Sequence, residues 1–154
     1  MIPIKNAIQQ GVWLHCSGED KEPRYEKLDL RLKVLNFEKV DFTKVDKPEK
    51  VRFQDEGIYW IMQVEVINLL KDEISASLLR NFILLTDQDG YSFRIEADSH
   101  LSYSEYAKQV GLYRLNSGKL RPKMKVRGAI SFLLPDDDYA EYSIAVANGT
   151  IVEA

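Results

Sequence analysis

The strongest constraint on the fold is a period-two alternation of apolar and charged side chains. Residues 28–34 read Leu-Asp-Leu-Arg-Leu-Lys-Val, and residues 58–66 repeat the pattern with heavier side chains. Successive side chains of a strand point to opposite faces, so both segments are predicted to be strands with one face on a core. In the second, which we expect to be central, the inward set is Trp60, Met62, Val64 and Val66, and the outward set is Gln63 and Glu65.

Turn signals separate further apolar runs. Residues 82–85 and 91–96 flank Asp87-Gln88-Asp89-Gly90, and Asp-Gly between two such runs predicts a hairpin. Residues 126–134 and 140–146 are expected to form another pair across residues 135–138. Residues 12–16 are predicted to form a short edge strand. Six or more strands with regular turns are typical of a sandwich or a barrel.

The 154 residues are predicted to form one domain, 1–154. Its expected parts are an N-terminal arm over 1–26 that carries the edge strand, an exposed loop over 41–56 and a helical insertion over 99–112. The loop is rich in Lys, Asp and Glu. In the insertion, the S-x-x-E capping box at 102–105 predicts a short helix from about 103 to 110, ended by Gly111.

Charge and composition bound the class of protein. The net charge of −3 provides no positive field, so nucleic acid is an unlikely partner. The single cysteine, Cys16, rules out an internal disulfide and favours a reducing compartment. Residues 1–10 lack the apolar core of a signal peptide, and no apolar run approaches the ~20 residues that span a bilayer. We therefore expect a cytoplasmic protein as the sequence is written, and an extracellular or cell-envelope one if an export signal was trimmed.

The second half of the chain resembles a bacterial group of immunoglobulin-like sandwiches, the immunoprotective-extracellular-protein-like domains and related lipoprotein domains of unknown function. The matching residues span roughly 58–146; they are Val66, Asn68, Phe82, Leu84, Asp89-Gly90, Phe93, Leu120, Pro122, Gly128, Phe132 and Pro135. Lys123 replaces the Gly that usually follows Pro122, so a different turn is expected there. The resemblance implies an immunoglobulin-like fold. Together with the alternation and the capping box, it leads us to predict an all-β, immunoglobulin-like antiparallel β-sandwich of about seven strands with one short surface helix. It also implies a binding or interaction role, and it brings no catalytic residues.

A row of cations is the most regular polar pattern. The five residues alternate along the chain, and they are Lys119, Arg121, Lys123, Lys125 and Arg127. In an extended segment they would share one face, with Leu120, Pro122, Met124, Val126 and Gly128 on the core side. Such a row could bind an anion. The plainer interpretation, which we favour, is a solvated strand face whose charges discourage aggregation.

Acidic turns raise the question of calcium. Asp87, Asp89 and the run Asp136-Asp137-Asp138 offer carboxylates, but no complete EF-hand loop is present. Turn chemistry accounts for both clusters, so no metal site and no cofactor is expected. The histidines, His15 and His100, lack metal spacing or a nucleophile motif. Cys16 should point away from His15 because neighbours on a strand face opposite sides.

Three tyrosines around the predicted helix form a candidate partner surface: Tyr103, Tyr106 and Tyr113. Tyrosine is enriched at interfaces because it offers apolar area and a hydroxyl together. Our leading hypothesis is a non-catalytic binding or interaction module for a protein partner or for a second copy of the chain in a homodimer. The alternative is a small-ligand or anion-binding protein that uses the basic row. An unrecognised enzyme ranks third.

Overall fold

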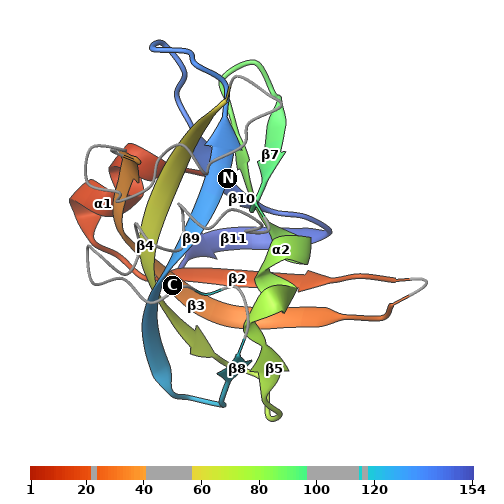
Figure 1. Ribbon diagram of the computed structural model, residues 1–154. Helices are drawn as coiled ribbons and strands as arrows, with labels where there is room; N and C mark the ends of the chain where they lie inside the picture. Colours follow the sequence, from red (N-terminus) through yellow and green to blue (C-terminus); the bar gives the residue numbers. More distant parts are fainter. Residues whose placement is uncertain (22–23, 41–56, 97–114, 116–117) are drawn as a thin grey trace, which may run out of the picture.

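Two antiparallel β-sheets face each other in the computed structural model, which describes residues 1–21, 24–40, 57–96, 115 and 118–154 (Figure 1). The five-stranded sheet has the order β11-β2-β3-β4-β9, and the four-stranded sheet has the order β1-β10-β6-β7. A short ribbon pairs β5 with β8. The predicted fold class, an all-β antiparallel sandwich, is confirmed.

The strands of the larger sheet are β2 (Leu14–Glu19), β3 (Lys27–Lys39), β4 (Ile58–Asn68), β9 (Lys125–Leu134) and β11 (Gly149–Glu153). Those of the smaller sheet are β1 (Ile2–Pro3), β6 (Ile83–Thr86), β7 (Ser92–Arg94) and β10 (Ser143–Val146). The ribbon consists of β5 (Ile74–Ser75) and β8 (Lys119–Leu120). The described helices are α1 (Ile4–Gln10), the 3-10 turn η3 (Ala76–Leu78) and α2 (Leu79–Phe82).

The core lies between the two sheets, and the alternation of β3 supplies much of it. Leu28, Leu30, Leu32 and Val34 are all at most 1% exposed. They meet Phe82 of α2 and the buried side chains of the smaller sheet in one apolar cluster. Burying a side chain of this size stabilises the fold by about 1.5–3 kcal/mol. The even-numbered face of β3 is therefore the face that holds the sandwich together.

A β-bulge in β3 changes which residues face the core. Val34 pairs with Val64, but the next partner of the strand is Asn36, so Leu35 is left without one. Because the side-chain period is two, one extra residue moves the following side chains to the other face. Phe37 lies opposite Met62 and Lys39 opposite Trp60, both on the core side of β4.

The central position of 58–66 is confirmed, since β4 lies between β3 and β9. Met62, Val64 and Val66 are buried, and Trp60 is partly buried against the core. The expectation that the outward set is exposed is wrong for Glu65, which is 7% exposed. Both Lys125 and Arg127 lie against its carboxylate, at 3.6 Å and 3.5 Å.

The hairpin predicted around Asp-Gly is confirmed. β6 pairs with β7 in antiparallel register, and the turn is closed by the Asp87 N–H, which donates to the Tyr91 carbonyl at 3.0 Å. Gly90 has φ +88°, a conformation that side chains with a Cβ rarely adopt.

Two predictions about the arrangement of the strands are wrong. Residues 126–134 and 140–146 do not pair, because β9 pairs with β4 along its length while β10 belongs to the other sheet. The turn after Pro135 thus carries the chain from one sheet to the other. Residues 12–16 do not form an edge strand, since β2 lies between β11 and β3.

The N-terminal arm contains a strand and a helix that the sequence analysis does not predict. It begins with β1 and continues into α1, whose buried residues are Ile4 and Ala7, with Ile8 packed against the core. This i, i+3, i+4 spacing is the apolar stripe of a helix, which the polar character of the segment obscured. Gly11 ends the helix in the left-handed conformation at φ +61°. The predicted loop at 41–56 and helix at 103–110 lie outside the described residues.

Candidate functional site

A cavity of about 650 Å³ opens at one end of the sandwich, and we call it the α1 cavity. Four segments distant in sequence line it: β1 and α1, the end of β3, the start of β4, and the connection from β9 to β10. Its described lining residues are Pro3, Ile4, Lys5, Asn6, Ile8, Phe37, Lys39, Ile58, Trp60, Pro135, Asp136, Asp137, Asp138, Ala140, Glu141 and Tyr142.

Three aromatic rings form the wall of the α1 cavity. Phe37 stacks on Trp60 with ring centroids 4.7 Å apart and an interplanar angle of 22°. Tyr142 meets Phe37 edge-on at 6.4 Å. Behind this wall, Phe132 contacts Phe37 at 6.5 Å and is fully buried. These offset and edge-to-face geometries are the favourable ones for aromatic rings, so the wall is held in one arrangement.

The bulge at Leu35 puts this wall in place. Without the extra residue, Asn36 and Glu38 would fall on the core side of β3, where Phe37 and Lys39 lie. The Lys39 ammonium lies 5.7 Å from the centroid of the Trp60 ring and 3.8 Å from a carboxylate oxygen of Asp138. A strand irregularity that re-aims side chains is a common feature next to binding sites.

The opposite side of the α1 cavity is anchored by backbone pairing. Ile2 and Pro3 pair with Ile144 and Ser143 of β10, and the Ile4 N–H donates to the Tyr142 carbonyl at 3.0 Å. The start of α1 is therefore tied both to β10 and to Tyr142, the residue that precedes this strand.

Tyr142 is the ionisable residue of the aromatic wall, and the pKa of its phenol is raised. Partial burial raises the pKa of its phenol above the usual 10.0, and the negative charges of Asp137 and Asp87 raise it further. The ring also contacts Phe93 edge-on at 6.0 Å. At neutral pH it therefore presents a protonated hydroxyl.

The basic row is not one continuous face. Lys119 lies 3.1 Å from Glu73, and Arg121 lies 4.0 Å from the same carboxylate. Lys125 and Arg127 instead lie against the carboxylate of Glu65, which belongs to β4. The two groups are separated because the chain turns at Lys123, which has φ +64°. Four of the five cations are thus paired with carboxylates in two different places.

The alternation expected on the core side of the row also fails in part. Leu120 and Gly128 are buried, but Met124 is 56% exposed, so it does not face the core. Lys123 adopts the left-handed conformation that a glycine takes most easily. The sequence predicts a different turn here because Lys123 replaces a glycine. The backbone of Lys123 nevertheless adopts a glycine-like conformation.

The acidic turns use their carboxylates for capping. The N–H groups of Asp89 and Tyr91 donate to the Asp87 carboxylate at 3.0 Å and 2.9 Å. In the same way, the Tyr139 N–H donates to Asp137 at 3.0 Å. Across the described parts of the chain, no group of three potential metal ligands is found. These hydrogen bonds agree with the turn chemistry that the sequence indicates.

His15 and Cys16 point to opposite faces of β2, as predicted. The His15 imidazole contacts the Asp29 carboxylate at 2.7 Å on the partly exposed face. The Cys16 side chain is fully buried, and burial raises the pKa of its thiol to about 12. A thiol held this strongly in its neutral form is a poor nucleophile, so Cys16 is a core residue. His100 and the tyrosines Tyr103, Tyr106 and Tyr113 lie outside the described residues.

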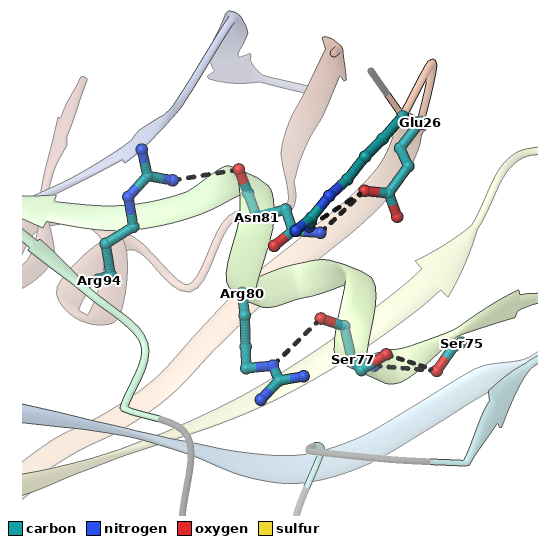
Figure 2. Close-up of polar contacts among 7 residues, drawn as sticks. Glu26, Ser75, Ser77, Arg80, Asn81 and Arg94 are labelled. Carbon is teal, nitrogen blue, oxygen red and sulfur yellow. Dashed lines mark hydrogen bonds and ion pairs between the residues drawn. The ribbon is translucent and has the colours of Figure 1, made fainter. Parts of the chain in front are cut away.

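The polar side chains around α2 hold that helix in place without meeting at a common point (Figure 2). Arg94 donates to the Asn81 carbonyl at 3.1 Å, and the Asn81 amide donates to Glu26 at 3.0 Å. Arg80 points to a different side of α2, where it reaches the Ser77 carbonyl at 3.5 Å. These contacts dock α2 onto its neighbours rather than outline a binding site.

A buried polar group closes the far end of β4, and we call it the Asn68 junction. The Asn68 side chain is 1% exposed, and its amide donates to the carbonyls of Asp72 and Leu120 at 2.9 Å each. Its side-chain oxygen accepts from the Leu70 N–H at 2.9 Å. The asparagine singled out by resemblance therefore ties the loop after β4 to β8.

Sequence reasoning did not find the α1 cavity. Trp60 was expected in the core, and Phe37, Lys39 and Tyr142 were not singled out. One local signal was present: Val34 and Leu35 are adjacent apolar residues, where the alternation changes phase. The remaining members come from separate segments, which the fold brings together.

Comparison with known proteins supports the fold. No family model matches the chain, and no curated protein sequence matches it. A conserved hypothetical protein from Bacillus anthracis is 12% identical with a TM-score of 0.51, over 92% of this chain and 99% of that one. The secreted protein MPT63 from Mycobacterium tuberculosis is 11% identical with a TM-score of 0.52, over 91% and 92%.

A putative lipoprotein from Bacillus subtilis is 14% identical with a TM-score of 0.48, over 91% of this chain and 38% of that one. In the described part of this chain, no helix has the length and apolar character needed to cross a membrane. At these identities the first two likenesses show the fold alone. The chain thus shares an all-β sandwich fold with uncharacterised and secreted bacterial proteins.

Proposed function

We propose that the protein is a non-catalytic binding module that receives a small ligand in the α1 cavity. The observation that carries this proposal is the placement of Phe37, Trp60 and Tyr142. These rings line an open cavity of about 650 Å³ and are only partly buried. Ligand sites are concave, lined mainly by apolar and aromatic side chains, and about 300–1,000 Å³ in volume.

The incomplete burial of the three aromatic rings supports a binding role. Large aromatic side chains contribute most to stability when they are buried, and here three of them keep part of their surface open to solvent. A sandwich selected for stability alone would close such a wall with a larger apolar neighbour. A bound ligand would complete the burial that the fold leaves unfinished.

The lining also favours binding over catalysis. The described residues around the α1 cavity contain no histidine, cysteine, serine or threonine. Nucleophilic catalysis by a hydroxyl or a thiol, and base catalysis by an imidazole, would need one of these side chains. Of the rim carboxylates, Asp137 caps the Tyr139 N–H and Asp138 faces Lys39.

The anion-binding alternative has less support. Four of its five cations are divided between Glu65 and Glu73, so an anion would have to compete with carboxylates that already contact them. A protein partner on the tyrosine surface stays a prediction, because its residues lie outside the described part of the chain.

The test is a screen of small aromatic and aliphatic fragments by NMR, with ¹⁵N-labelled protein. We expect hits to shift the indole N–H of Trp60 and the backbone signals of Phe37 and Tyr142. Trp60→Ala should weaken the hits by about tenfold or more, since an aromatic contact is lost on the ligand side.

Trp13→Ala provides the matched control, because Trp13 meets Lys33 away from the α1 cavity. It should leave the affinities of the hits unchanged. Hits that map to other surfaces, or a screen without any hit in the presence of a well-dispersed spectrum, would contradict the proposal.

A further inference from the structure

We propose that the α1 cavity selects a small organic cation with an apolar body, and that the Lys39 ammonium lies where the charge of the ligand would lie. This inference rests on the proposed function, because it names the class of ligand for the same cavity. It follows from the charge of the rim, from the contacts of the Lys39 ammonium and from the register of β3.

The charge of the rim favours a cation. Four carboxylates border the α1 cavity, and they are Asp136, Asp137, Asp138 and Glu141. The cations among its described lining residues are Lys5 and Lys39, so negative charge is in excess. All four carboxylates belong to the connection between β9 and β10, so one segment of the lining carries this negative charge.

The wall provides the second half of a cation site. An aromatic face attracts a cation through the quadrupole of the ring, most strongly for tryptophan. Trp60 lies in the wall and Asp138 lies at the rim, so one charge can contact both. The Ile4, Ile8 and Ile58 side chains of the lining would contact the apolar body of the ligand.

Lys39 marks where that charge would sit. Its ammonium lies 5.7 Å from the Trp60 centroid and 3.8 Å from Asp138, so the protein's own cation already uses both groups. The contact is open to solvent, since the side chains of Lys39 and Asp138 are 51% and 82% exposed. An ion pair this exposed is weak, so a ligand can displace it at little cost.

The register of β3 explains how a lysine reaches this position. Lys39 lies opposite Trp60 on the core side of the sheet, where the residues of β3 before the bulge are apolar. The unpaired Leu35 shifts the strand so that the lysine, and not Glu38, points toward the ring. A glutamate there would add to the negative rim, whereas the lysine neutralises part of it.

The experiment compares three probes of similar shape and different charge: benzyltrimethylammonium, benzyl alcohol and phenylacetate. Binding is followed by the emission of Trp60 in a Trp13→Phe background, because the chain has two tryptophans. We expect the cation to bind about tenfold more tightly than the neutral probe, and the anion to bind more weakly than both. Added salt should reduce the preference for the cation.

Two lysine variants separate competition from overall charge. Lys39→Met keeps the apolar stem and removes the ammonium, so it should tighten benzyltrimethylammonium binding by about fivefold. Lys33→Met removes the same charge from a lysine outside the α1 cavity, whose ammonium lies over the ring at position 13. It should change the affinity by less than about twofold.

The outcomes are distinct. Benzyl alcohol or phenylacetate binding as tightly as the cation would overturn this inference and leave the binding function intact. Weaker cation binding by Lys39→Met than by the wild type would overturn the role of Lys39. Absence of binding by all three probes would overturn the inference as well, and the fragment screen then shows separately whether the cavity binds any ligand.

Discussion

The two ends of strand β4 are built from opposite kinds of contact. At the Asn68 junction, a buried amide makes three side-chain hydrogen bonds and is 1% exposed. Near the other end, Trp60 and Phe37 stack in a wall that stays partly open. One strand thus carries a closed polar junction and an open aromatic cavity. If the α1 cavity binds a ligand as proposed, stability and binding depend on different ends of the sandwich.

The distance between the two ends makes this division testable. Residues 60 and 68 are separated by roughly 26 Å at the usual rise of a strand. Effects of substitutions at such a distance are additive in most proteins, because the sites share no contacts. A change at one end should therefore leave the other end's property unaltered.

The largest expected effect is that of Asn68→Ala. The substitution leaves the carbonyls of Asp72 and Leu120 and the N–H of Leu70 without their side-chain partner, so it should lower the free energy of unfolding by about 3 kcal/mol. Urea denaturation measures this change. It should not alter ligand affinity in the α1 cavity.

Asn81→Ala is the matched control for the junction. Asn81 is partly buried and its side chain makes one hydrogen bond, to Glu26, so we expect a loss below about 1 kcal/mol. If both asparagine variants lose the same stability, the Asn68 junction has no special part in holding the sandwich together.

The sequence predicts the closed parts of the molecule better than the open one. Alternation over 28–34 and 58–66 indicates the two central strands, because each residue's face follows from its neighbours in the chain. The turn at Asp-Gly is local in the same way. These features depend on a few consecutive residues, and the structure confirms them.

The α1 cavity could not be predicted in this manner, since it depends on four separate segments. The phase change at Leu35 is visible in the sequence, but its consequence requires the partners of β3. The crossing of the chain between sheets after Pro135 was also missed, because adjacent strands in a sequence pair more often than they separate. The acidic run that follows it therefore lies at the rim of a cavity that the sequence alone does not reveal.

A smaller effect on stability is expected at the open end. Trp60→Phe keeps a ring against Phe37 and removes part of the wall, so the free energy of unfolding should fall by less than about 1 kcal/mol. Ligand affinity, measured with the fragment hits, should nevertheless fall severalfold. Together with Asn68→Ala this forms a crossed test: each variant should lose the property that the other retains.

The crossed test can fail in a clear way. A Trp60→Phe protein that is as destabilised as Asn68→Ala but binds normally would show that the aromatic wall belongs to the stabilising core. Denaturant midpoints and ligand titrations on the same two samples decide between the two interpretations.

The smallest expected effect concerns the ionisation of Tyr142, at the open end. Its pKa is raised by partial burial, by Asp137 and by Asp87, so folding disfavours the phenolate. The contribution of this phenol to stability is therefore complete below pH 10 and is lost as pH rises through its raised pKa. Tyr142→Phe should remove that decline from the stability profile above pH 10.

Asp137→Asn sharpens this prediction by removing one of the causes. The pKa of Tyr142 should move down toward its ordinary value, as followed by the NMR signal of the labelled phenol carbon. Asp136→Asn is the control, since Asp136 is not among the causes of the shift and should move the pKa less. A pKa that does not fall in Asp137→Asn would mean that the charge of Asp137 does not act on the phenol of Tyr142. A cation bound in the α1 cavity should lower the same pKa, because positive charge favours the phenolate. The titration of Tyr142 thus reports on the acidic rim and the aromatic wall in one measurement. The Asn68 side chain at the other end of β4 does not ionise, so it offers no equivalent titration.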